Sequence, residues 1–277
     1  MTTKKAQWLP EISEDEYNAI PALRATELKI FARSAAHYQA YKQKPKEETE
    51  SLRWGKLVHL RCLQPDVYRK NKVIAPKFDR RTKEGKMASA AFEASLLPES
   101  VIVTEDEDKK LREIRTSFWE YLKFKRNLWD SITEVERAGV ATVRGVDCKI
   151  KPDMFRFDES LLLQQMWDLK TTQDASESAF IRSIYNYGYH LQAAFYAVVA
   201  EEITGFAFDK FTFLAIEVEP PFAIREFELS ETAMHHAKSV VYQKLEYFAC
   251  CQQMDLWEAY PATKIAVETP KWLLDNF

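Results

Sequence analysis

Two aspartates and a lysine form the most informative pattern in the chain. Asp153 follows Pro152, Asp168 lies 15 positions further on, and Lys170 comes two positions after Asp168. Both aspartates border short apolar runs rich in strand-forming residues, so pairing of these runs as neighbouring strands would bring the carboxylates together. Lys170 then shares a face with Asp168, because strand side chains alternate with a period of two. Carboxylate oxygens beside an ammonium group suit Mg²⁺ or Mn²⁺ acting on a phosphodiester.

A helix is expected over residues 177–203, directly after the second motif strand. At ~100° per residue, four polar side chains of this helix lie within about 60° of one another: Tyr185, Tyr189, Gln192 and Tyr196. An apolar arc lies next to them, so one face would pack and the other could reach the carboxylates. We expect Gln192 and Tyr196 to hydrogen-bond metal ligands or a phosphate. The alternative is a half-buried amphipathic helix with tyrosines at its margin.

The remaining elements alternate between helices and strands along the chain. Ser13 and Glu16 form a capping box for a short helix. Further helices are expected at 26–41, 52–63, 82–97, 105–125 and 231–253, and strands at 133–138, 140–144, 148–157, 161–169, 211–217 and 223–228. This order predicts an α/β fold with a central mixed β-sheet flanked by helices. We expect one domain over 1–277, with an N-terminal helical segment (1–50), a core (51–204) and C-terminal strands and helices (205–277).

Composition excludes several classes of protein. The longest apolar run, residues 193–200, is much shorter than the roughly 20 residues that span a bilayer, so no membrane partner is expected. The first residues lack the apolar segment of a secretory signal. The four cysteines show no C-x-x-C spacing, which argues against a zinc ribbon and an iron–sulfur cluster. These features predict a reduced, cytoplasmic protein.

The net charge of −3 gives no overall attraction to nucleic acid, so DNA contacts must come from local basic patches. One such patch is the connector over residues 77–86, with five basic residues: Lys77, Arg80, Arg81, Lys83 and Lys86. We expect these side chains to grip the DNA backbone or a terminal phosphate. The alternative is an ordinary solvated loop.

The motif residues in their context resemble the RecE-type exonucleases, that is, exodeoxyribonuclease VIII and its phage relatives. The resemblance is carried by DLKTT-x-DAS from Asp168 and NYGYH-x-QAAFY from Asn186. It extends upstream to APKFDRRTK-x-GK from Ala75, WGKLVH from Trp54, AAHY from Ala35 and Leu28-Lys29. It covers roughly residues 14–204. These enzymes belong to the PD-(D/E)-x-K (restriction-endonuclease-like) nucleases with the RecB-like variation, so the same nuclease core is implied here.

The resemblance implies an activity and partners. Similar proteins use Mg²⁺, for which Mn²⁺ is expected to substitute, and degrade the 5′-terminated strand of linear double-stranded DNA, leaving 3′ tails for recombination. They work as homo-oligomeric rings with a RecT-type single-strand annealing protein. Two departures stand out: Gln64 replaces the usual glutamate of Leu-Glu-Pro, and Lys149 and Lys151 lie where relatives commonly have arginines.

The resemblance also implies roles for individual residues. The expected metal ligands are His59, Asp153, Asp168 and the carbonyl of Leu169, and one of Glu134 and Glu136 could join them. Lys170 would orient or deprotonate the attacking water, while Gln192 and Tyr196 would organise the ligands. His59 alone would otherwise be read as a packed or surface histidine. Two rival functions stay open: a metal-dependent endonuclease of the same fold, and a DNA-binding module without catalysis.

Overall fold

The computed structural model describes residues 6–44, 48–79, 81–125, 134–158, 163–208 and 210–269. Its main sheet has five strands in the order β10 (Ile224–Glu228), β9 (Lys210–Glu217), β8 (Leu163–Thr172), β7 (Met154–Asp158) and β4 (Glu134–Val135). Strands β8 and β9 are parallel and the other neighbours are antiparallel. The predicted mixed sheet is therefore confirmed.

Two smaller sheets accompany the main one. An antiparallel sheet joins β1 (Gln7–Trp8), β5 (Gly139–Val143) and β6 (Val146–Ile150), and a parallel pair joins β2 (Lys72–Ile74) and β3 (Val101–Val103). The described helices are α1 (Glu14–Ala19), α2 (Ala25–Arg33), α3 (Ala35–Gln43), α4 (Glu50–Leu63), α5 (Pro65–Asn71), α6 (Lys83–Ala94), α7 (Glu105–Phe124), α8 (Glu177–Asn186), α9 (Tyr189–Thr204) and α10 (Glu231–Met254). None of them is both long and apolar enough to cross a membrane.

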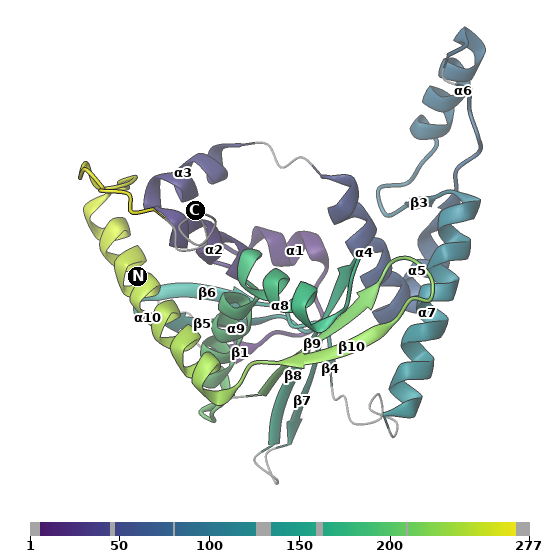
Figure 1. Ribbon diagram of the computed structural model, residues 1–277. Coiled ribbons are helices and arrows are strands. Elements are labelled where there is room, and N and C mark those ends of the chain that lie inside the picture. Colours follow the sequence, from purple (N-terminus) through teal and green to yellow (C-terminus); the bar gives the residue numbers. More distant parts are fainter. Residues whose placement is uncertain are drawn as a thin grey trace.

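Helices cover both faces of the main sheet, so a hydrophobic core lies on each side. Side chains of β9 point alternately into one core and the other. Phe211 and Phe213 pack in a core with α2, α8, α9 and α10, whereas Leu214 and Ile216 pack in a second core with α4 and α7. Figure 1 shows α4 and α7 on one side of the strands and α9 and α10 on the other. On β8, Met166 belongs to the α9 side, so Asp168 and Lys170 face α9 as well.

The strand predicted over 148–157 is wrong as a single element. The chain leaves β6 at Ile150 and enters β7 at Met154, and these two strands belong to different sheets. Pro152 lies in the gap, and it has no amide proton to offer to a continuing ladder. Asp153 therefore lies directly before β7, where its carbonyl oxygen accepts a hydrogen bond from the Glu136 amide. The strand predicted over 133–138 is also shorter, because Glu136 adopts a left-handed conformation with φ of 50° directly after β4; Thr133 and Leu161 lie outside the described residues.

Two predicted helices are each divided in two. Residues 26–41 form α2 and α3, separated by Ser34, which is extended and whose hydroxyl accepts a hydrogen bond from the His37 amide at the start of α3. Residues 177–203 form α8 and α9, separated at Gly188, whose φ of 64° lies in the left-handed region. Tyr185 therefore does not share a helix face with Gln192, and its side chain is exposed on α8.

Candidate active site

The two motif aspartates meet where β7 begins. Met154 pairs with Trp167 across the antiparallel β7–β8 ladder, which brings Asp153 level with Asp168 on the neighbouring strand. Asp153 Oδ2 accepts a hydrogen bond of 2.7 Å from the Leu169 amide. The predicted pairing of the two carboxylate-bearing segments is thus present in the structure.

Asp168, Lys170 and Gln192 form one hydrogen-bonded group. Lys170 makes an ion pair with Asp168 through Oδ2, and Gln192 Nε2 donates to Asp168 Oδ1 at 2.8 Å. The other end of the same amide, Gln192 Oε1, accepts from Lys170 Nζ at 3.3 Å. Asp168 is only 2% exposed. Gln192 on α9 therefore holds both Asp168 and Lys170 from the helix that packs on this face of the sheet.

His59 reaches the site from α4. Its Nε2 lies 2.6 Å from the Leu169 carbonyl oxygen, and its Nδ1 lies 3.4 Å from Asp153 Oδ2. Burial lowers the pKa of His59, but the carboxylates of Asp153 and Asp168 outweigh that effect and raise it to about 9. Both ring nitrogens face acceptors, so the doubly protonated imidazolium is the form that this geometry satisfies.

The carboxyl groups respond to the same charges in opposite directions. Burial opposes the ionisation of Asp153, but His59, Lys170 and the Leu169 amide together hold its pKa below the ordinary value. For Asp168, burial and repulsion by Asp153 outweigh Lys170, and its pKa is raised. Burial disfavours the charged form of Lys170, yet the two aspartates raise its pKa above the ordinary value. Lys170 is therefore a firmly protonated group in this arrangement.

Glu136 joins the site, whereas Glu134 does not. Ligand atoms of His59, Glu136 and Asp153 lie within 4.8 Å of one another. Glu134 instead makes an ion pair of 2.5 Å with Arg137. The sequence could not distinguish Glu134 from Glu136 as a possible metal ligand. Glu136 reaches the site because its backbone is left-handed directly after β4, and residue spacing does not predict that conformation.

Tyr196 is half-buried beside the site, and its hydroxyl contacts backbone and not a proposed metal ligand. Its hydroxyl donates to the Lys151 carbonyl oxygen at 3.3 Å, and burial raises its pKa well above the ordinary value. Tyr196 was expected to hydrogen-bond metal ligands or a phosphate, but its hydrogen bond in this structure supports the segment that leads into Asp153. Gln192 is the residue that contacts the motif side chains directly.

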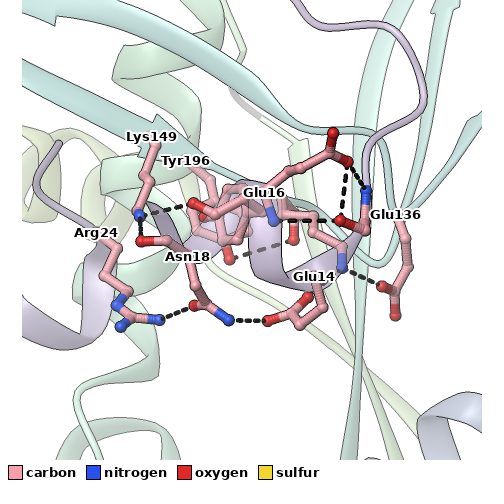
Figure 2. Close-up of polar contacts among 10 residues, drawn as sticks. Glu14, Glu16, Asn18, Arg24, Glu136, Lys149 and Tyr196 are labelled. Carbon is pink, nitrogen blue, oxygen red and sulfur yellow. Dashed lines mark hydrogen bonds and ion pairs between the residues drawn. The ribbon is translucent and has the colours of Figure 1, made fainter. Parts of the chain in front are cut away.

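Lys149 and Lys151 hold helix α1 beside the site, a role that the sequence did not predict. Lys149 is buried, and its ammonium group donates to the carbonyl oxygens of Tyr17, Asn18 and Ile20 at 2.9, 3.2 and 2.9 Å. Lys151 makes ion pairs with Glu14 at 2.7 Å and with Glu136 at 2.8 Å. Figure 2 shows Lys149 against Asn18 at one end of this cluster and Glu136 at the other. The two basic residues before Pro152 therefore have distinct structural roles.

The basic connector lies apart from the motif residues. It leads into α6, which stands away from the rest of the molecule above α7 (Figure 1). Lys77 pairs with Asp106 at 3.7 Å, and Arg81 pairs with Asp79 at 3.1 Å. Arg80 lies outside the described residues, and Lys83 and Lys86 are located on α6. None of the described connector residues lines the cleft at the motif.

A cleft of about 2330 Å³ opens in front of the motif. Its lining comes from α1, α2, α4, the β4 end, the end of β8 and the α8–α9 turn, and includes His59, Glu136, Lys170 and Gln192. The charged side chains of His59, Glu136 and Lys170 are thus accessible to a ligand in this cleft. Because residues from several helices and strands line this cleft beside the motif, we identify it as the candidate active site.

The donor set in this cleft fits a hard divalent cation. His59 and Glu136 line the cleft, Asp153 brings a ligand atom within 4.8 Å of theirs, and Asp168 lies level with Asp153 on the neighbouring strand. Carboxylate and imidazole groups are ligand types that Mg²⁺ and Mn²⁺ accept. Asp168 Oδ2 is already in contact with the Lys170 ammonium group, so the case for a metal rests on the donor types that meet here. Asp153, Asp168, Glu136 and His59 are therefore suited to hold a metal ion.

Comparisons with known proteins show the family and the fold of the chain. The model of a family described as "PDDEXK-like domain of unknown function (DUF3799)" matches residues 25–265. The structure is similar to that of a protein from Eubacterium rectale described as a "Putative exonuclease", with a TM-score of 0.55 and 12% sequence identity over 97% of this chain and 98% of that chain. At that identity the similarity shows a shared fold. No curated protein matches the sequence.

Proposed function

The chain belongs to the family of PDDEXK-like domains, and from this membership we propose that it is a Mg²⁺-dependent exonuclease that degrades the 5′-terminated strand of linear duplex DNA. Its product would carry 3′ single-stranded tails suited to recombination. The single observation that supports the proposal most is the convergence of Asp153, Asp168 and Lys170 where β7 begins beside β8, at the cleft that Lys170 lines. A DNA-binding module without catalysis would have no use for this complete set.

The roles proposed for the side chains follow from their contacts. Asp153, Asp168, Glu136 and His59, with the carbonyl of Leu169, would hold the metal, which supplies Lewis-acid stabilisation of the phosphate and activates a water molecule. Lys170, held by Asp168 and Gln192, would orient the attacking water and balance charge on the phosphate. Lys170 is protonated here, so in this form it donates hydrogen bonds and would not accept the proton of the water. Gln192, which hydrogen-bonds both Lys170 and Asp168, would hold these two side chains in position.

The wider biological context is carried over from the resemblance to RecE-type exonucleases. We propose a homo-oligomeric ring that threads linear duplex and delivers one strand to the cleft. A RecT-type single-strand annealing protein would take over the exposed 3′ tail. The connector residues Lys77, Arg81, Lys83 and Lys86, with Arg80, would contact DNA phosphates outside the cleft.

The proposal is tested with linear duplex labelled at either the 5′ or the 3′ end, with Mg²⁺ or with EDTA, beside a closed circular duplex. We expect Mg²⁺-dependent release of the 5′ label as mononucleotides or short products and no cleavage of the circle. Cutting of the circle would identify the endonuclease alternative. Asp168→Asn should abolish degradation, whereas Asp66→Asn, a carboxylate change elsewhere in the same cleft, should not. No metal-dependent cleavage of any duplex would refute the proposal.

A further inference from the structure

Lys29 on α2 extends toward the motif through space that Gly188 leaves free. A Cβ atom at position 188 would lie 3.0 Å from Lys29 Cδ and 3.4 Å from its Cγ. The ammonium group lies 5.6 Å from the centre of the Tyr189 ring. Lys170 Nζ lies 4.8 Å from the centre of the same ring. One tyrosine ring therefore links the motif lysine to a second lysine from another helix.

Lys29 lacks the ion pairs or hydrogen bonds that stabilise the charges of the neighbouring lysines. Lys170 has Asp168, Lys151 has Glu14 and Glu136, and Lys149 has three carbonyl oxygens. Within the described residues Lys29 makes no ion pair and donates no hydrogen bond; its ammonium group instead faces the ring of Tyr189. Burial and repulsion by Lys170 lower the pKa of Lys29 to about 8, although the Asp168 carboxylate acts in the opposite direction. A partly desolvated cation that no anion contacts is costly unless a ligand supplies that contact.

Lys29 lines the same cleft as Lys170 and Gln192, together with Thr26 from its own helix. The attacked phosphate is expected at Lys170, and the next phosphate of the same strand must lie further along the cleft. We infer that Lys29 binds the backbone phosphate next to the one that is cleaved, and so sets the position of the strand relative to the metal ligands. This inference rests on the proposed nuclease function and adds a strand-positioning contact to it. Basic residues outside the cleft would not provide this registration.

The test separates this role from a structural one. Lys29→Met keeps the aliphatic stem beside Gly188 and removes only the charge. The matched control is Lys56→Met, because Lys56 lines the same cleft but is highly exposed and already paired with Glu48 at 2.6 Å. Affinity for a short duplex with a single-stranded overhang is measured in EDTA by fluorescence anisotropy over a range of NaCl concentrations, and thermal unfolding is recorded without DNA.

For Lys29→Met we expect several-fold weaker binding, a plot of log affinity against log salt that is flatter by roughly 0.7 to 0.9, and a melting temperature equal to or above that of the parent. The control should match the parent in all three. Unchanged affinity and salt slope, or a lower melting temperature with intact DNA binding, would overturn the inference. Lys29→Gln provides a second charge-free variant should the methionine disturb folding, and the same outcomes apply to it.

The two proposals fail in different ways. A parent protein that cleaves linear duplex while Lys29→Met binds and cleaves like the parent refutes only the role of Lys29. A parent that neither binds nor cleaves DNA refutes the nuclease function and, with it, the phosphate contact.

Discussion

His59 offers the sharpest test of the site, because its two ring nitrogens already face acceptors. In the metal-free protein the ring is held as an imidazolium between Asp153 and the Leu169 carbonyl, with a pKa of about 9. A metal ligand must be the neutral ring, so binding of the ion has to displace a proton from His59. Metal affinity should therefore depend on pH far above the range in which an ordinary histidine titrates.

The magnitude follows from the pKa. With a pKa of about 9, roughly 1% of the ring is neutral at pH 7, so affinity there should be about 100-fold below its limit at high pH. It should rise about tenfold for each pH unit between pH 6.5 and 8.5, with release of about one proton for each ion bound. A histidine with the ordinary pKa of about 6.5 would give a plateau above roughly pH 7. For the metal-free fold the sign is reversed: stabilisation by the protonated ring is complete below about pH 6.5 and is lost as pH rises through about 9.

Calorimetric titration with Mn²⁺ at pH 6.5, 7.5 and 8.5, in buffers of different ionisation enthalpy, measures both the affinity and the proton release. His59→Gln should bind more weakly and lose most of the slope. His236→Gln, an exposed histidine change on α10, should reproduce the parent slope. A parent whose affinity is level from pH 7 upward, or which releases no proton, would refute the assignment of His59 as a metal ligand.

Three further predictions concern lysines. Lys170→Met should nearly abolish DNA degradation yet retain Mn²⁺ affinity in calorimetry, because its ammonium group acts beside the carboxylate and not as a ligand; a loss of affinity as large as for Asp153→Ala would contradict this. Lys149→Met should lower the free energy of unfolding by about 2 to 4 kcal/mol in urea, since buried carbonyls lose their charged donor, and an unchanged midpoint would show that α1 is held by other interactions. Replacing Lys83 and Lys86 by alanine should flatten the salt dependence of DNA binding by roughly 0.7 to 0.9 for each phosphate that these lysines neutralise, whereas a solvated connector would leave it as in the parent.

The central part of the site could be predicted from local rules. A period of two fixes Asp168 and Lys170 on one face of a strand, and the apolar runs beside the two aspartates fix the pairing of β7 with β8. Gln192 lies in the helical segment after β8, on α9 beyond the break at Gly188, and helical spacing alone predicted that it faces the motif carboxylates. These features depend on residues close in sequence or on one strand pairing.

The remaining features depend on backbone geometry and on contacts between distant segments. Pro152 and Gly188 were visible in the sequence, but that they separate β6 from β7 and α8 from α9 depends on which sheet or layer each half joins. The choice of Glu136 over Glu134 follows from one residue with positive φ. Leu28-Lys29 belongs to the residues that carry the resemblance, but the lack of an ion pair at Lys29 depends on its surroundings in three dimensions.

The hydrogen bonds from Lys149 to α1 also affect the order in which parts of the chain fold. The contact between Lys149 and the Tyr17 carbonyl joins residues 132 positions apart. At a ribosomal rate of about 5 to 20 residues per second, α1 waits on the order of ten seconds before β6 exists to receive it. A helix of six residues is too short to persist alone during that time. Helix α1 should therefore dock late in folding and detach early in partial unfolding, and the link from Glu14 to Lys151 would come and go with it. The stretch of chain synthesised early would then be among the last to close over the cleft.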